Sequence, residues 1–254
     1  MSEAGYQSPI SPGRSFYEDS IAGRPRYPRL DGSRQADLVI VVAQTDPEKG
    51  ALGFSLLVVE RGMEGFERGR HLDKIGLEAQ DTAELFFSDV RVPKANLLGE
   101  RGRGYANFLR ILDEGRIAIA ALAVGAAQGC VDESVKYAKE RQAFGHAIGE
   151  YQAIQFKIAR MEARAHTARS AYYNAAALML AGKPFKKEAP IAKLIASEAA
   201  MWITHQAVQI HGGMGYSKEM PIERYFRDAK ITEIYEGTSE IQRLVIARNE
   251  TGLR

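Results

Sequence analysis

Apolar runs of strand length occupy the first third of the chain. Residues 38–43 and 54–59 are short runs rich in β-branched side chains, and a third run covers 82–92 and stops at Pro93. The first two runs are nearly continuous in apolar residues, which predicts strands that are buried on both faces. Three strands alone make a poor sheet, so we expect further strands to complete it.

Beyond residue 99 the apolar residues recur at spacings of three and four. Such spacings over 124–138 and 151–165 predict two amphipathic helices. A third helix is predicted over about 186–211, and a last one from about Thr238 to Asn249. The breaks between them are the glycine-containing segments 145–149, 182–184 and 212–215. Long helices joined by short loops predict an antiparallel four-helix bundle.

The fold class predicted from these patterns is α+β, in three parts. Residues 1–35 contain several prolines, glycines and serines without a sustained apolar period. Such a segment cannot bury enough surface to offset the entropy of ordering it, which predicts an irregular tail. Residues 36–98 are predicted to form a partial β-domain, and residues 99–254 a helical bundle domain.

Charge and composition argue against several classes of partner. The net charge is +2 with scattered basic residues, whereas a nucleic-acid-binding protein presents a basic face. No stretch is predicted to span a membrane, and no signal peptide is visible, which favours a cytoplasmic location. The single cysteine, Cys130, is predicted to be a small packed side chain. Since His211 has no second ligand at metal-binding spacing, no metal site is expected.

Residues 234–242, Ile-Tyr-Glu-Gly-Thr-Ser-Glu-Ile-Gln, are a candidate for catalysis. Thr238 or Ser239 can cap a helix that starts here, and Gly237 permits close approach of the backbone. The carboxylate of Glu236, beside an apolar isoleucine and tyrosine, would be desolvated and so become a stronger base. A purely structural helix start is the commoner explanation, so composition leaves both interpretations open.

Two further segments combine glycines or an arginine with polar side chains. In 209–216, three glycines follow a helix and can present N–H groups to a diphosphate, or can simply end the helix. In 140–145, Arg141 has the forked donor group that suits a diphosphate, and Phe144 could pack on a ring. The alternative for 140–145 is a solvated arginine and a buried phenylalanine at a helix end.

A glycine also lies inside the first long helix, within residues 112–116, Leu-Asp-Glu-Gly-Arg. In a helix interior Gly115 costs about 1 kcal/mol relative to alanine. A glycine in such a position often makes room for a neighbouring group. We therefore expect something to approach the helix closely at Gly115.

The order and spacing of these segments resemble the acyl-CoA dehydrogenases, from about Ala36 to Arg248. The most specific pieces are Glu-Arg-Gln-Ala-Phe-Gly at 140–145, Gln-Ile-His-Gly-Gly-Met-Gly at 209–215 and Tyr-Glu-Gly-Thr-Ser at 235–239. Residues 73–98 are similar to the end of that family's middle β-domain. The resemblance implies a flavoenzyme that uses FAD to convert an acyl-CoA thioester to a trans-2-enoyl-CoA.

The resemblance also implies a role for each matching residue. Glu236 is implied to be the base that removes the α-proton of the thioester, while its amide helps to polarise the thioester carbonyl. The residues implied to contact FAD are Arg141, Phe144, Gln152, Gln209, Ile210, His211, Gly212, Gly213, Thr238, Ser239 and Glu240, with Arg141 and Gln152 reaching across a subunit interface. The residues implied to contact the substrate are Asp113, Glu114, Gly115, Arg116 and Gly237. Some family members carry their base at the position of Gly115, where this chain has no carboxylate.

The partners implied by the resemblance are an acyl-CoA substrate, an electron-transferring flavoprotein as acceptor, and further copies of the chain in a homodimer or homotetramer. The family's amino-terminal helical domain and the first half of its β-domain have no counterpart in this sequence. Part of the expected flavin slot and acyl pocket is therefore not accounted for. Two rival interpretations stay open. One is a truncated or accessory subunit that supplies Arg141 and the glycine loop to a partner, and the other is an acyl-CoA oxidase.

Overall fold

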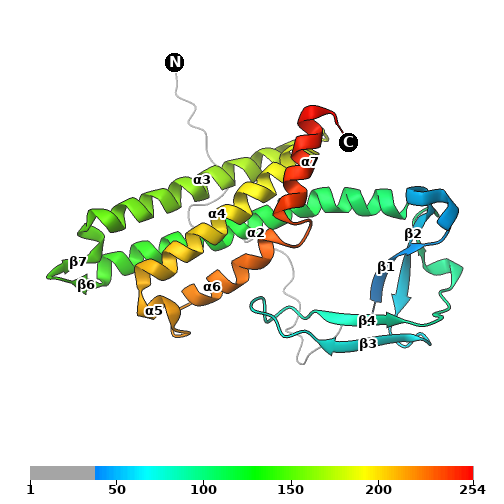
Figure 1. The fold of residues 1–254 in the computed structure, drawn as a ribbon, viewed down its shortest axis with the longest axis horizontal. Helices are drawn as coiled ribbons and strands as arrows, with labels where there is room; N and C mark the ends of the chain where they lie inside the picture. The colour runs from blue at the N-terminus through cyan, green and yellow to red at the C-terminus, as the bar shows by residue number, and fades with distance from the viewer. Residues whose placement is uncertain (1–37, 254) are drawn as a thin grey trace, which may run out of the picture. The chain divides into compact units, whose positions relative to one another are not determined.

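A computed structural model of the chain describes residues 38–253 (Figure 1). The predicted irregular tail, residues 1–35, lies outside the described residues. Within the described range, short strands come first and long helices follow, as the sequence pattern predicts.

The strands of the described residues form three small antiparallel sheets, of which the last is the short pair β6 (Gln142–Ala143) and β7 (His146–Ala147) between the long helices. β1 (Leu38–Gln44) pairs along its whole length with β2 (Phe54–Glu60), and β2 pairs on its other edge with β5 (Leu97–Leu98). β3 (Phe66–His71) pairs with β4 (Ala83–Phe87). The order β1-β2-β5 places β2 in the centre of the larger sheet, where its apolar run is needed.

The structure confirms two of the predicted strands and corrects the rest of the strand prediction. The run at 82–92 forms a strand only as far as Phe87, because the chain turns at Asp89, where φ is +53°. β3 was not predicted, since its sequence, Phe-Glu-Arg-Gly-Arg-His, has no apolar run. Burial on both faces holds for β2 but is wrong for β1, where Leu38 and Ile40 are 57% and 60% exposed. Among residues 38–253, no element packs over that outer face of β1.

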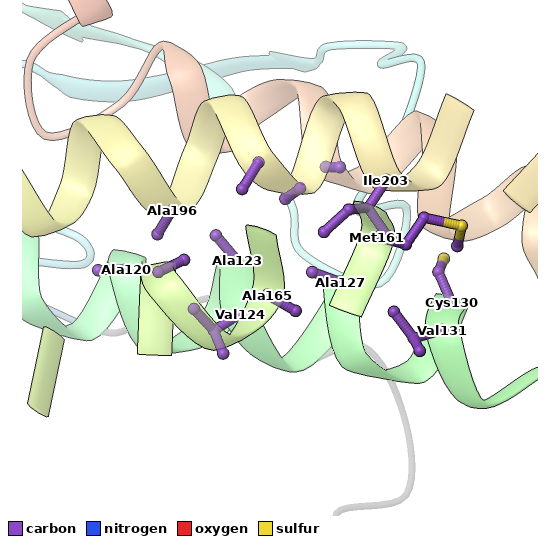
Figure 2. Close-up of a cluster of buried hydrophobic side chains, with 14 of the residues drawn as sticks. Ala120, Ala123, Val124, Ala127, Cys130, Val131, Met161, Ala165, Ala196 and Ile203 are labelled. Atoms are coloured by element: carbon purple, nitrogen blue, oxygen red, sulfur yellow. The ribbon is translucent and has the colours of Figure 1, made fainter. Parts of the chain in front are cut away.

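Three long helices form the core of the helical part: α2 (Gly104–Glu140), α3 (Gln152–Leu180) and α4 (Glu188–His211). They lie side by side, and their contact faces consist largely of alanines, whose small side chains let the helices approach closely (Figure 2). The buried residues at these contacts include Ala120, Ala123, Ala127, Cys130, Met161, Ala165, Ala196 and Ile203. Cys130 is therefore a packed side chain, as predicted, and burial raises the pKa of its thiol to about 12.

Three shorter helices complete the described chain: α5 (Gly213–Tyr216), α6 (Ile222–Ala229) and α7 (Ser239–Thr251). The helix predicted from about Thr238 to Asn249 corresponds to α7. The sequence pattern missed α6, because eight residues are too few to establish a period. α6 nevertheless buries its first and last residues, Ile222 and Ala229, and packs on α4.

α2 corrects the expectation that no segment is apolar enough to span a membrane. By length and composition alone it qualifies, with an 18-residue window of mean hydropathy 1.2. In the structure, however, this helix packs against both α3 and α4, and it carries much of the bundle core. These contacts between helices bury 44% of that window.

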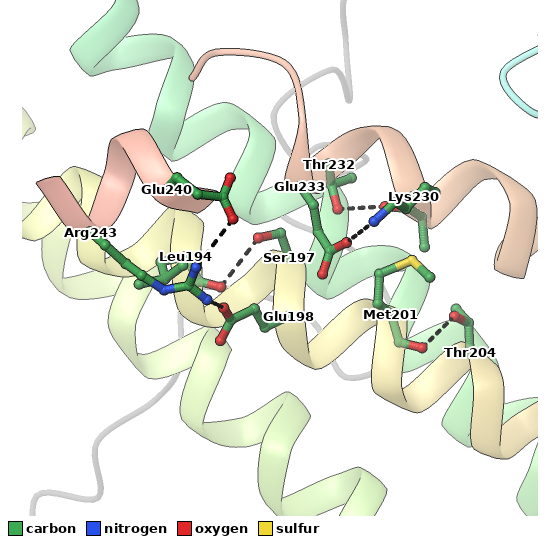
Figure 3. Close-up of polar contacts among 11 residues, drawn as sticks. Leu194, Ser197, Glu198, Met201, Thr204, Lys230, Thr232, Glu233, Glu240 and Arg243 are labelled. Atoms are coloured by element: carbon green, nitrogen blue, oxygen red, sulfur yellow. Dashed lines mark hydrogen bonds and ion pairs between the residues drawn. The ribbon is translucent and has the colours of Figure 1, made fainter. Parts of the chain in front are cut away.

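Polar contacts attach α7 to α4. Arg243 of α7 reaches Glu198 of α4, and its second guanidinium nitrogen lies 3.4 Å from Glu240 of its own helix (Figure 3). Because α7 follows directly on residues 234–238, these contacts also hold the end of that segment against the bundle.

A second set of contacts attaches residues 74–80 to α6. The backbone N–H of Leu77 donates to Asp228 Oδ1 at 2.6 Å, and Arg227 Nη1 donates to the carbonyl oxygen of Ile75 at 2.9 Å. A Cβ atom on Gly76 would lie 2.7 Å from the backbone of Arg227, so glycine is required for this approach. Residues 74–80 therefore lie against α6, the helix that precedes residues 230–238 in the chain.

Candidate functional site

Glu236 lies in the segment between the 3₁₀ turn Lys230–Glu233 and α7, next to the middle of α2. A Cβ atom on Gly115 would be 3.2 Å from Glu236 Cγ and 4.0 Å from Glu236 Oε1. The expectation that something approaches Gly115 closely is therefore confirmed, and the approaching group is the candidate base. Glu236 also has a φ of +51°, which is costly for a residue with a side chain.

Two side chains hydrogen-bond to the segment that carries Glu236. Gln242 Nε2 donates to the carbonyl oxygens of Glu236, at 3.0 Å, and of Gly237, at 2.7 Å. Lys193 Nζ of α4 donates to the same Gly237 oxygen at 2.8 Å. Lys193 and Gln242 are both completely buried. These hydrogen bonds fix two consecutive carbonyl groups and so stabilise the strained backbone at Glu236.

Sequence reasoning missed Lys193 and Gln242. Gln242 was within the quoted segment 234–242 but had no assigned role. Lys193 lies in an otherwise apolar stretch of α4, Ala-Pro-Ile-Ala-Lys-Leu-Ile-Ala. A lysine among residues that face a helical core is a signal in itself, because a buried ammonium group needs partners.

The start of α7 has the cap that the sequence predicts. Thr238 is the N-cap residue, and its hydroxyl accepts a hydrogen bond from the N–H of Ile241 at 3.4 Å. Ser239 is buried, and its hydroxyl has no partner among the described residues. Hydrogen bonds from its own amide and from the Thr238 hydroxyl hold the pKa of Glu240 below its ordinary value. A negative charge there also suits the positive end of the helix dipole.

Glu236 is only partly desolvated. Its side chain and that of Tyr235 are half-buried, whereas Ile234 is 48% exposed. The apolar surroundings that the sequence predicts are therefore incomplete in the described part of the chain.

Asp113 and Arg116 of α2 form an ion pair within one helical turn of Gly115. Arg116 Nη1 donates to Asp113 Oδ1 at 2.5 Å, and both side chains are largely buried. Burial raises the pKa of Asp113, while the charges of Arg116 and Lys186 oppose that rise. Arg116 Nε is buried and has no hydrogen-bond partner among the described residues. Glu114 points away and is exposed.

A second cluster lies where α2 ends and α4 ends. A cavity of about 420 Å³ there is lined by Tyr137, Arg141, Ile148, Ile210, His211, Gly212, Gly213 and Met214. The structure thus brings together Arg141 and the glycine segment, which are far apart in sequence. A guanidinium group and glycine N–H groups around one cavity are suited to an anion such as a diphosphate.

The glycine segment is open to a ligand. Gly212 has a φ of +58°, and a Cβ atom on either Gly212 or Gly213 would meet nothing within 4 Å. His211, in contrast, is structural in its contacts: its ring stacks on Tyr137 at 4.4 Å, and Nδ1 lies 2.8 Å from the carbonyl oxygen of Ala207. Burial lowers the pKa of His211. Its Nε2 is buried without a partner in residues 38–253.

Six of the predicted flavin contacts do not line this cavity. Thr238, Ser239 and Glu240 lie at the start of α7 instead. Phe144 is 94% exposed, which is opposite to the buried phenylalanine of the structural alternative. Gln152, at the start of α3, and Gln209, on α4, are also exposed. No cluster of histidine, cysteine, aspartate or glutamate side chains suited to a metal ion occurs in the described range.

Comparison with known proteins identifies the family. The sequence pattern of the acyl-CoA dehydrogenase carboxy-terminal domain matches residues 102–251. The chain is 49% identical over 219 residues to an acryloyl-CoA reductase (NADH) of Anaerotignum propionicum, covering 86% of this chain and 56% of that protein. It is 51% identical over 218 residues to the mitochondrial short-chain specific acyl-CoA dehydrogenase of Rattus norvegicus, covering 86% of this chain and 53% of the relative.

A solved structure agrees with these relatives. The butyryl-CoA dehydrogenase of Megasphaera elsdenii superposes with a TM-score of 0.82 at 46% identity, covering 85% of this chain and 56% of that one. The chain therefore spans about half the length of the curated relatives that it matches. The match of the carboxy-terminal domain, the identity to these relatives and the shared fold place the chain in the acyl-CoA dehydrogenase family.

Proposed function

We propose that this chain carries the base and part of the flavin and CoA sites of an FAD-dependent acyl-CoA dehydrogenase. The observation that carries the proposal is the placement of Glu236, whose side chain occupies the gap that Gly115 leaves in α2. The missing side chain at Gly115 leaves room for the carboxylate, which a strained backbone holds in a fixed place as a base. Short-chain acyl-CoA thioesters are the proposed substrate class, since the rat relative is specific for short chains.

Glu236 is proposed to remove the α-proton of the acyl thioester. The α C–H bond breaks, the proton goes to the carboxylate, and the β-hydrogen leaves as hydride, which gives the trans-2-enoyl thioester. When bound, FAD supplies the acceptor for that hydride. The same groups serve the reverse reaction if the protonated Glu236 returns its proton, and a reductase is among the similar proteins.

The residues present fit the diphosphate portion of FAD. Arg141 supplies a forked cation, and Gly212 and Gly213 supply accessible backbone beside the same cavity. The unpaired hydroxyl of Ser239, at the start of α7, is a further buried donor available to a cofactor or substrate. We propose that these residues hold FAD, with Thr238 and Glu240 at the same helix start.

Arg116 is proposed to contact the substrate. Its guanidinium group is fixed by Asp113, and its free Nε leaves one donor for a polar group of the CoA portion. This fits a site in which the thioester approaches between α2 and residues 234–238.

The exposed residues at the end of α2 support a shared site between subunits. Arg141, Phe144 and Gln152 all lie at the surface, and a phenylalanine that is 94% exposed has no stabilising contact in a single chain. We propose a homodimer or homotetramer in which these residues reach the flavin of a neighbouring copy, with an electron-transferring flavoprotein as acceptor. Light scattering at micromolar concentration tests the assembly, and a strictly monomeric protein would contradict it.

The role of Glu236 is tested with Glu236→Gln in the flavin-loaded protein. Loss of a general base should slow reduction of the flavin by butyryl-CoA by at least about a hundredfold, with binding retained. Glu162→Gln, on the exposed face of α3, is the matched control. Fast reduction in Glu236→Gln would overturn the assignment, and rapid peroxide formation by the wild type would favour an oxidase.

A further inference from the structure

Lys193 is completely buried in the middle of α4, with an exposed fraction of 0%. Burying an ammonium group is costly unless it is paired and hydrogen-bonded. Its hydrogen-bond acceptor is the carbonyl oxygen of Gly237, at 2.8 Å, which is the residue directly after the proposed base. The lysine therefore stabilises the segment that carries Glu236 rather than a distant part of the fold.

Charged groups on α2, on the segment before α7 and on α7 act on Lys193. Glu236 and Glu233, from the segment before α7, and Glu240 of α7 stabilise its positive charge, while Arg116 of α2 opposes it. Burial outweighs these carboxylates and lowers the pKa of Lys193 to about 8. At neutral pH the ammonium form still dominates, so Lys193 presents both a donor and a positive charge.

Lys193 and Gln242 act on the same carbonyl group. Gln242 donates to the Gly237 oxygen at 2.7 Å and also to the Glu236 oxygen at 3.0 Å. Gly237 has a φ of +93° and Glu236 a φ of +51°. Glycine adopts a positive φ without strain, but Glu236 does not, so its backbone conformation needs a restraint from outside the segment.

We propose that Lys193 is a positioning residue of this site, which holds the Gly237 carbonyl so that the Glu236 carboxylate stays over Gly115. This inference rests on the proposed function of Glu236. A merely structural lysine would affect the stability of the bundle without a specific effect on residues 234–238.

Two variants test this role. Lys193→Met removes both the donor and the charge at similar length, and Lys193→Gln keeps a donor without the charge. Lys157→Met is the matched control, because Lys157 also donates to a neighbouring helix, at 3.0 Å to Gln206 Oε1, but lies away from Glu236. All are made in the 254-residue chain and compared at equal fractions folded.

Hydrogen–deuterium exchange of the amides in residues 234–240 measures how firmly this segment is held. Lys193→Met should accelerate exchange there by about tenfold or more, Lys193→Gln by less, and Lys157→Met not at all. Unchanged exchange of residues 234–240 in Lys193→Met would overturn the inference.

If Lys193→Met does not fold, Lys193→Gln gives the same measurement, and exchange of residues 234–240 at the wild-type rate would then overturn the inference. In the flavin-loaded protein, Lys193→Met should lower kcat by about 10- to 100-fold with little change in KM. The exchange measurements use neither flavin nor substrate. A failure of the Glu236→Gln test therefore removes the proposed function without touching them, and their failure removes only the role of Lys193.

Discussion

Gly115 of α2 and Glu236 of the segment before α7 contact one another across the helical core: a Cβ atom on Gly115 would lie 3.2 Å from Glu236 Cγ. Gly115→Ala should therefore leave the helix as stable as before or more stable, by up to about 1 kcal/mol, because alanine is the better helix former. Its methyl group should nevertheless displace the Glu236 side chain and slow flavin reduction in the loaded protein.

Gly125→Ala is the control for this substitution. Gly125 lies in the same helix, and a Cβ atom there would meet nothing within 4 Å. It should gain the same stability without loss of reduction. Thermal unfolding and stopped-flow flavin reduction measure the two effects. Equal reduction rates in both variants would show that the approach to Gly115 is unimportant for the reaction.

The buried Lys193 should make stability depend on pH in the alkaline range. Its pKa is about 8 in the folded chain and has its ordinary value of 10.5 in the unfolded chain, so between these values the unfolded chain binds more protons. Stability should rise as pH increases from about 8 to 10.5, and the gain is lost as pH falls through 8. The full effect corresponds to roughly 3 kcal/mol.

Urea unfolding of the wild type and of Lys193→Met across this pH range measures the contribution, since other titrating groups are common to both. The difference in unfolding free energy between the two proteins should change with pH. A constant difference would mean that the lysine is not desolvated as its burial indicates.

Arg141 should matter for flavin retention more than for folding. Its side chain is exposed and lines the cavity with Gly212 and Gly213, so its removal leaves the bundle core intact. Arg141→Ala should weaken FAD binding by about tenfold or more, the scale of one charge-assisted hydrogen bond pair. Arg160→Ala, exposed on α3, is the control. Flavin content after dialysis and thermal unfolding measure the two effects. A loss of folding with flavin retained would contradict the prediction.

Asp228 should hold residues 74–80 against α6. Its Oδ1 accepts from the N–H of Leu77, a residue with a φ of +48°. Asp228→Ala leaves that N–H without its acceptor and should cost about 1–2 kcal/mol. Exchange of amides in residues 74–80 should accelerate, while the same measurement on Asp132→Ala, which removes an exposed acceptor on α2, should show no change in this segment.

The sequence by itself determined the features that depend on neighbouring residues. The helical period, the glycine breaks and the Thr238 cap are local, because they follow from side-chain direction and backbone preference within a few positions. The same holds for β2, whose apolar run is the centre of its sheet. The family could also be recognised from short segments, since their residue types and spacing are preserved along the chain.

Only the tertiary structure decided which distant residues meet. Gly115 and Glu236 lie in different helical regions, and their contact depends on how α2 and the start of α7 pack together. Lys193 is separated by 44 positions from the carbonyl group that it holds, so no local pattern could pair them. The exposure of β1 is decided by whether another layer covers its face. Burial and contact between distant segments are properties of the packed chain, and the physical chemistry of the site arises from them.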